Sequence, residues 1–148
     1  MNPVVDNTPY IALVDDDAHS ARLLTRMLLA HGSPRIETFD GAADAMERLA
    51  PALGHGSQQW PGLVIVDLKA HSGANLEFLN TLAPIARTFD VPVAVMAQFL
   101  DQHLAPALHE AGAAAVFVRH ADRDAYRREA ANIVSFWARC QRLDAVGM

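Results

Sequence analysis

The feature of this sequence that most limits its possible folds is a regular alternation of short apolar runs with longer amphipathic segments. Five runs of five to seven residues are rich in Val, Ile, Leu and Ala, which indicates buried strands. The run at 63–67 is the most apolar, so we expect it near the centre of a sheet. The predicted strands cover residues 10–14, 35–39, 63–67, 91–97 and 114–118.

Between these runs, apolar residues recur at the spacing of three and four that predicts amphipathic helices. Gly32 is placed to end the first helix. We expect Pro84 to interrupt the third helix near its end, and Pro106 to restrict the fourth to a short C-terminal piece. The predicted helices cover residues 18–32, 40–53, 75–86, 101–112 and 122–142.

Strands that alternate with helices predict a parallel α/β sheet, because right-handed crossovers place helices over both of its faces. We expect one domain over residues 1–148, with a core of about 10–139 and short terminal extensions. Ligands of such sheets bind at the carboxyl ends of the strands. The run Asp15, Asp16, Asp17 ends the first strand and Asp67 ends the third. These two strand ends are neighbours if the strand order is 2-1-3-4-5.

Composition argues against several classes of function. The formal net charge of −5 does not suit a nucleic-acid-binding surface, which needs clustered Lys and Arg. No apolar run reaches the roughly 18 residues of a membrane span, and the N-terminus lacks the pattern of a signal peptide. The single cysteine, Cys140, suits a reducing compartment. We therefore expect a cytoplasmic protein that binds neither nucleic acid nor membrane.

The clustered aspartates need a positive partner. Carboxylates that share a crevice repel one another and lose hydration, which costs several kcal/mol each unless a cation neutralises them. Mg²⁺ favours oxygen ligands and keeps several waters, so one or two carboxylates and a carbonyl suffice to hold it. A carboxylate beside Mg²⁺ can also act as a nucleophile toward phosphorus and form an aspartyl phosphate.

Four segments, in this order and spacing, resemble the receiver domain of two-component response regulators: ALVDDDAHSARLL, GLVIVDLKAHSGANLEFL, VPVAVMAQ and GAAAVFVRH. The resemblance extends over residues 10–139. It implies a flavodoxin-like (βα)5 fold with the strand order 2-1-3-4-5 and a role in two-component or phosphorelay signalling. It also implies that the chain is not an enzyme, beyond transferring a phosphoryl group to itself.

By position, the resemblance assigns Asp67 as the phosphoacceptor and Asp16 as a direct Mg²⁺ ligand. Asp15 is expected to act on the metal mainly through water, and the backbone carbonyl of Lys69 to be a further ligand. Asp17 falls at a variable position, where we expect it to cap the first helix.

The sequence departs from the family pattern in the parts that relay phosphorylation. Ala97 stands where Thr or Ser usually bonds the phosphoryl group, and Val116 where an aromatic residue usually follows the switch. Arg119 replaces the Lys that normally ends the fifth strand. In the loop after the acceptor, His71 replaces Pro and Asn75 replaces Gly.

Two versions of a receiver therefore stay open. In the first, Asp67 accepts a phosphoryl group with Mg²⁺. In the second, a pseudo-receiver, Arg119 or Lys69 supplies the positive charge, and partners bind without phosphorylation. A third alternative is a small phosphatase similar to the haloacid dehalogenases, with Asp15 and Asp17 as its acids; that class favours Ser or Thr where this chain has Asp67.

As a stand-alone receiver, the chain would act through protein–protein contacts. The resemblance implies a sensor histidine kinase or a phosphotransfer protein upstream, and a downstream partner on the face of the fourth helix, fifth strand and fifth helix. Phe136 and Trp137 are adjacent on the last helix, so we expect one of them to point away from the core unless another part of the molecule covers it. That exposure would favour a partner surface, and homodimerisation is left open.

Overall fold

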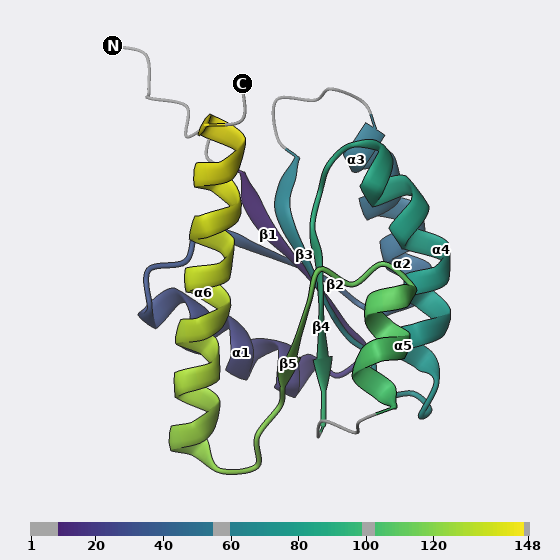
Figure 1. The fold of residues 1–148 in the computed structure, drawn as a ribbon. Helices are drawn as coiled ribbons and strands as arrows, with labels where there is room; N and C mark the ends of the chain where they lie inside the picture. Colours follow the sequence, from purple (N-terminus) through teal and green to yellow (C-terminus); the bar gives the residue numbers. More distant parts are fainter. Residues whose placement is uncertain (1–8, 55–59, 99–102, 147–148) are drawn as a thin grey trace.

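The computed structural model describes residues 9–54, 60–98 and 103–146, without the side chains of 142–146. A five-stranded parallel sheet forms the middle layer, in the order β2-β1-β3-β4-β5 (Figure 1). The predicted flavodoxin-like fold and its strand order are therefore confirmed. The strands are β1 (Tyr10–Asp15), β2 (Ile36–Phe39), β3 (Pro61–Asp67), β4 (Val93–Ala97) and β5 (Ala115–Val118).

Helices cover both faces of the sheet, as Figure 1 shows. One face carries α1 (Ala18–Ala30) and α6 (Arg123–Val146), which contact each other. The opposite face carries a continuous helical segment after β2 and two further helices. These elements are α2 (Ala42–Asp44), the π-helical η1 (Ala45–Leu49), α3 (Ala50–Gly54), α4 (Ala74–Thr88) and α5 (Leu104–Glu110).

The two-residue period of the strands divides the core between the two faces of the sheet. Ile11 and Leu13 of β1 pack toward α1 and α6, whereas Val14 packs toward α4. Every residue of β1, β3 and β4 is buried, which is why these strands have continuous apolar sequences. The prediction that residues 63–67 lie centrally is confirmed, because β3 pairs with β1 on one side and β4 on the other.

Most of the predicted helix ends are also found. Asp17 caps α1, since its Oδ1 accepts hydrogen bonds from the backbone N–H groups of His19 (3.0 Å) and Ser20 (3.2 Å). Gly32 follows the end of α1 with a φ of +88°, a left-handed conformation that favours glycine. Pro106 lies in the first turn of the short helix α5, as expected.

The prediction that Pro84 interrupts its helix is wrong. Helix α4 runs through Pro84 and ends only at Thr88. Proline removes one intrahelical N–H donor, but here the helix is held on both sides of it by buried apolar residues such as Leu82 and Ala86. Tertiary packing of α4 against the sheet therefore outweighs the local disruption.

Neither Phe136 nor Trp137 points away from the core, because both are covered. Both side chains are half-buried and pack against the core under α1 and α6. The Phe136 ring meets the Phe117 ring of β5 edge to face, with 5.9 Å between ring centroids. Helix α6 lies beside an edge strand, so its apolar side extends around that edge.

Among the described residues, no helix has the length and apolar character to cross a membrane.

Candidate functional site

The predicted acids meet at the carboxyl edge of the sheet. Asp15 and Asp67 are directly paired residues of neighbouring strands, because β1 and β3 run parallel and in register up to their last residues. Both are buried, with 2% of Asp15 and none of Asp67 exposed. Two carboxylates in this position repel each other strongly and require compensation.

The side chain of Lys69 lies between these two carboxylates. Its Nζ is 2.7 Å from Asp15 Oδ1 and 3.1 Å from Asp67 Oδ2, and it also donates to the backbone carbonyl of Asp67 at 3.0 Å. Lys69 is the only lysine of the chain; the other eleven cationic residues are arginines. An ammonium with three donors therefore joins the two acids and the end of β3.

A second cation reaches Asp67 from the other side. The guanidinium Nη1 of Arg119, just after β5, is 3.2 Å from Asp67 Oδ1. The Arg119 backbone N–H donates to the carbonyl of Ala97 at 2.7 Å, which fixes the arginine beside the end of β4. Each oxygen of Asp67 thus has a cation of the chain within 3.2 Å.

Asp16 is directed toward the loop after β3. Its carboxylate accepts hydrogen bonds from the backbone N–H groups of Lys69 (3.0 and 3.1 Å) and Ala70 (2.9 Å). These bonds hold the backbone of Lys69 over the pocket, with its ammonium pointing down to Asp15. The role of Asp16 in this arrangement is to position the internal cation.

Asn75, which sequence analysis noted only as a replaced glycine, joins the ends of two strands beside the site. Its Oδ1 accepts from the N–H of Leu68 at 2.7 Å, and its Nδ2 donates to the carbonyl of Met96 at 2.9 Å. One amide therefore ties the end of β3 to the end of β4. A glycine at this position would have no side chain for either bond, so the clamp depends on the asparagine.

Burial dominates the electrostatics of the site. It raises the pKa of Asp67, and the charge of Asp15 raises it further, while Lys69 and Arg119 act in the opposite direction. Burial likewise raises the pKa of the Tyr126 phenol on α6, which also lies in the field of Asp67, Arg119 and Asp15. The helical spacing of α6 places Tyr126 on its core face, but only the folded structure places its hydroxyl in the field of the acids.

Three buried oxygens around the site lack a hydrogen-bond partner within the described parts of the chain: Asp15 Oδ2, Asp67 Oδ2 and the hydroxyl of Tyr126. Asp67 Oδ2 is close to the Lys69 ammonium, but outside hydrogen-bond geometry. The carboxylates of the site thus have cationic partners, but some of its buried oxygens have no hydrogen bond.

The remaining predicted positions surround the pocket. Ala97 is buried at the end of β4, where it presents a methyl group and no hydroxyl. Val116 is half-buried in β5 and packs against the core beneath α4 and α5. His71 is exposed, 3.4 Å from Glu77. His120 lies 3.8 Å from Glu129, whose carboxylate also accepts the N–H of Val118 at 2.8 Å.

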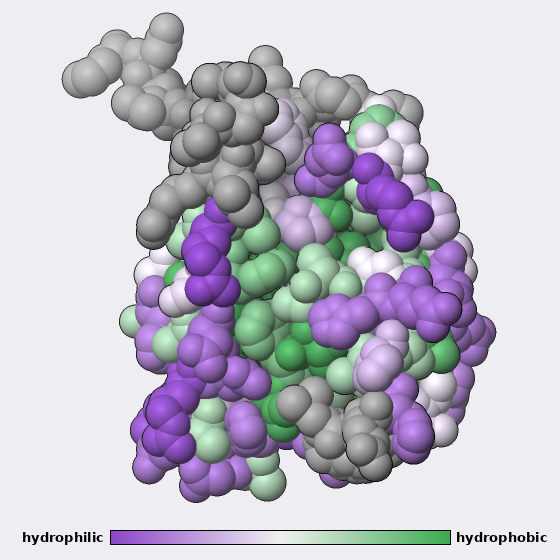
Figure 2. Space-filling view, in the orientation of Figure 1, coloured by the Kyte–Doolittle hydropathy of each residue, from purple (hydrophilic) through white to green (hydrophobic). Residues whose placement is uncertain are grey.

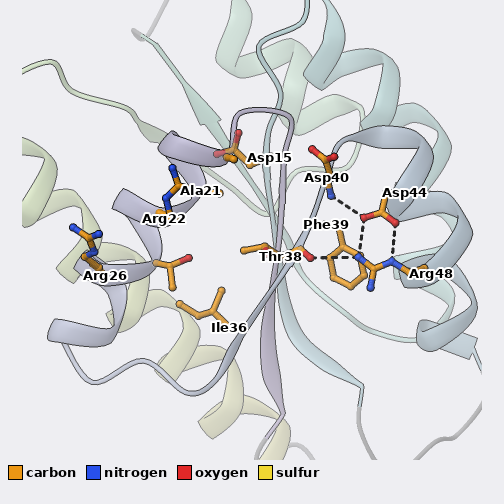
Figure 3. Close-up of a pocket in the computed structure, with 12 residues that line it drawn as sticks. Asp15, Ala21, Arg22, Arg26, Ile36, Thr38, Phe39, Asp40, Asp44 and Arg48 are labelled. Carbon is orange, nitrogen blue, oxygen red and sulfur yellow. Dashed lines mark hydrogen bonds and ion pairs between the residues drawn. The ribbon is translucent and has the colours of Figure 1, made fainter.

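A cavity of about 540 Å³ lies on the other side of Asp15, between α1 and β2 (Figure 3). On its far wall, Arg48 bonds Asp44 through two nitrogens, each at 2.7 Å, and reaches the carbonyl of Thr38 at 3.5 Å. The charge of Arg48 is thus neutralised by Asp44, and its side chain runs along the wall of the cavity.

The structure does not support the phosphatase alternative, which needs Asp15 and Asp17 to act together. Asp17 caps α1 and is exposed, so its carboxylate does not join that of Asp15.

No protein-family model matches the sequence, and no curated protein is significantly similar to it. Solved structures do match. A response regulator receiver domain from Rhodospirillum rubrum has a TM-score of 0.73 at 19% identity, covering 87% of this chain and 93% of the other. The phosphorylated cyanobacterial phytochrome response regulator RcpA has a TM-score of 0.71 at 19% identity, with 88% and 94% covered. The chain has the receiver-domain fold.

A third receiver structure, the Mn²⁺-bound form of response regulator Rcp1, has a TM-score of 0.70 at 19% identity, with 87% and 94% covered. A divalent metal is therefore part of at least one protein with this receiver fold. Here Asp15 and Asp67 each have a carboxylate oxygen without a hydrogen-bond partner in the described residues, but that of Asp67 lies 3.1 Å from the Lys69 ammonium.

The residues do not fit a metal ion as they are arranged. The Lys69 ammonium lies within 3.1 Å of both carboxylates, and the oxygens of Asp16 are bonded to backbone amides. Within the described ranges, no group of three or more His, Cys, Asp or Glu side chains is placed to hold a metal. A divalent ion beside Lys69 and Arg119 would meet two like charges. The assignment of a metal site to Asp15, Asp16, Asp67 and the Lys69 carbonyl, with Asp15 acting mainly through water, stays a prediction.

Proposed function

We propose that this chain is a receiver-fold signalling module that binds its partner without phosphorylation. The observation that carries the proposal is the ammonium of Lys69 between Asp15 and Asp67, 2.7 and 3.1 Å away. In this pseudo-receiver, the acids of a receiver pocket are permanently paired with cations of the same chain. They act as structural ion pairs that hold the strand ends together.

The fixed loop around the pocket supports this proposal. Asp16 holds the backbone of Lys69 and Ala70, and Asn75 joins the ends of β3 and β4. Ala97 has no hydroxyl with which to follow a phosphoryl group, and Val116 packs into the core. Every part of the pocket is thus held in one arrangement, which suits a constant binding surface.

The proposed partner surface is the face formed by α5, β5 and α6. Figure 2 shows apolar residues gathered between α6 and the helices on the opposite side, over the edge of the sheet. All four residues of β5 are half-buried, since β5 is an edge strand of the sheet. A half-open apolar face of this kind favours a protein partner or a second copy of the chain. The sheet edge also has unpaired backbone groups that a partner can bond.

A phosphate-accepting receiver is the second candidate function. Asp15 Oδ2 and Asp67 Oδ2 favour it, because neither has a hydrogen-bond partner among the described residues and both could accept a further ligand once Lys69 moves away. In that case the partners would be a sensor histidine kinase or a phosphotransfer protein, and Lys69 would leave its ion pairs to admit Mg²⁺. Its side chain is 22% exposed, so a path to solvent exists.

The single lysine permits a direct test of the two candidates. Protein labelled with ¹⁵N-lysine has one side-chain ammonium signal, that of Lys69. We expect this signal to be unchanged by Mg²⁺ at 10 mM, and no mass gain of one phosphoryl group after incubation with Mg²⁺ and a small phosphodonor. A Mg²⁺-dependent shift together with an adduct that is absent in Asp67→Asn would instead establish the phosphate-accepting receiver.

Removing the internal cation should convert the pocket into a metal site. We expect Lys69→Ala to lower the free energy of unfolding by about 2–4 kcal/mol, because two buried carboxylates lose their shared partner. Mg²⁺ should restore part of that loss in Lys69→Ala. The wild type and Lys69→Arg, which both keep a cation, should show no Mg²⁺-dependent rise in melting temperature. Equal stabilisation of all three proteins by Mg²⁺ would contradict the proposal.

A further inference from the structure

A cavity of about 740 Å³ lies between α1, the loop after β5 and the start of α6. It adjoins the acid pocket but opens on the α1 and α6 side of the sheet; Figure 1 shows α1 and the start of α6 on this side. Its volume is within the range of sites that bind small molecules. The proposed function uses Lys69, which is part of the cavity lining, but not the residues of α1 and α6 that also line it.

The charge of the cavity lining differs from that of the whole protein. The chain has a net charge of −5, yet five of the eleven lining residues are basic and none is acidic. Three of these five are already paired with acids outside the cavity: Lys69, Arg119 and His120. Arg123 and His19 form no ion pair among the described residues, although His19 lies in the field of the exposed Asp17 carboxylate.

The apolar part of the lining is formed by Leu23 and Met27 of α1 and by Tyr126 of α6. Tyr126 is 96% buried, with 4% of its surface exposed, and its hydroxyl has no hydrogen-bond partner within the described residues. An unpartnered buried hydroxyl costs about 1–3 kcal/mol, so a native structure normally provides it with an acceptor. The phenol lies in the field of Asp67, Arg119 and Asp15, and Tyr126 lines the cavity together with Arg119.

The start of α6 adds a further positive contribution. This helix has 24 residues and begins at Arg123, so its first N–H groups and the positive end of its dipole lie at the cavity. The Asp122 carboxylate accepts the N–H of Ala125, and its backbone carbonyl accepts the N–H of Tyr126, which leaves the earlier N–H groups of the first turn for another acceptor. The carboxylates of Asp122 and Asp124 flank this helix start.

We propose that this cavity binds a small organic anion: a phosphate monoester or carboxylate attached to an apolar or aromatic group. Arg123, His19 and the start of α6 hold the anionic group, and the Tyr126 hydroxyl donates a hydrogen bond to it. Leu23 and Met27 contact the apolar group. The inference does not depend on whether Asp67 is phosphorylated, because the residues that distinguish this cavity lie outside the acid pocket.

The test uses phenyl phosphate and benzoate as probes and benzyl alcohol as the neutral control, with backbone amide NMR shifts as the readout. We expect saturable shifts at His19, Ser20 and Arg123, with half-saturation on the order of 1 mM for a fragment of this size. The better of the two anions identifies the anionic group. Benzyl alcohol should bind at least tenfold more weakly.

Three variants make the test specific. Arg123→Glu should weaken binding of the better probe about tenfold or more, and Tyr126→Phe about three- to tenfold, while both proteins keep the wild-type amide spectrum elsewhere. Arg128→Glu makes the same charge change on an exposed part of α6 outside the cavity and should leave binding unchanged. Equal loss in Arg128→Glu, or no saturable binding of either anion at 20 mM, would overturn the proposal.

Discussion

At the scale of the residue, burial decides how a carboxylate responds to a cation. Asp67 has two cations within 3.2 Å, yet burial raises its pKa, so its ionisation lowers stability as pH rises through that value. Asp44, which lies near the surface, is bonded by Arg48 and by the N–H of Asp40. These hydrogen bonds lower the pKa of Asp44 to about 2. Both carboxylates have cationic partners, yet the pKa of the buried Asp67 is raised and that of Asp44 is lowered.

The pH dependence of stability should therefore change in Asp44→Asn. The folded pKa of about 2 is below the unfolded value of 3.8, so the carboxylate stabilises the fold fully above about pH 4. We expect the wild type to exceed Asp44→Asn in free energy of unfolding at pH 7, and this difference to shrink between about pH 4 and pH 2. Urea unfolding at a series of pH values measures it. A difference that stays constant down to pH 2 would be inconsistent with this pairing.

At the scale of the element, the loop after β3 is positioned by side chains from three places. Asp16 reaches it from the end of β1, Asn75 from the first turn of α4, and Lys69 returns from the loop itself to the acids. The amide of Asn75 also contacts the carbonyl of Met96, so the ends of β3 and β4 cannot separate without losing it. The loop therefore behaves as part of the sheet edge.

Removing this amide should loosen the sheet edge. We expect Asn75→Ala to lower the free energy of unfolding by about 1–3 kcal/mol, because it leaves a donor and an acceptor in a partly buried region without partners. Asn80→Ala is the matched control, since Asn80 is an exposed asparagine of the same helix. It should be neutral or slightly stabilising. Equal effects of the two variants in denaturant unfolding would show that Asn75 is not a clamp.

At the scale of the whole molecule, the sheet is most strongly held at its centre. β1 and β3 are each paired on both sides, and all their residues are buried. β2 and β5 are the edges, and all four residues of β5 are half-buried. The proposed partner surface therefore lies on the part of the sheet with the weakest packing, which a bound partner would cover.

Amide hydrogen exchange should be slowest in the central strands of the sheet and faster at its edges. We expect the amides of β3 to exchange only through global unfolding, and those of residues 115–118 in β5 to exchange faster, through local opening. Exchange followed by mass spectrometry or NMR measures both. Binding of the partner should slow exchange in β5 with little change in β3. Equal protection of the two strands in the free protein would contradict this account of the edge.

Much of the fold was predictable from the sequence because its signals are local. The alternation of apolar runs and helical periods established the five strands, the parallel sheet and the meeting of Asp15 with Asp67 at its edge. Asp17 as a helix cap and Gly32 after α1 followed from the same local rules.

Other features were decided only by the tertiary structure. Lys69 and Asp15 are 54 residues apart, and the sequence alone predicted Mg²⁺ at the acids with the internal cations as the alternative; only the folded structure shows the Lys69 ammonium against Asp15. Which of them the pocket accommodates depends on a side-chain direction set by Asp16 and by the packing of the strand ends. The continuation of α4 through Pro84 and the packing of Phe136 on Phe117 depend on long-range contacts in the same way. Local periodicity places residues on a face or at a strand end, whereas the partner of each charge is chosen by distances that exist only after folding.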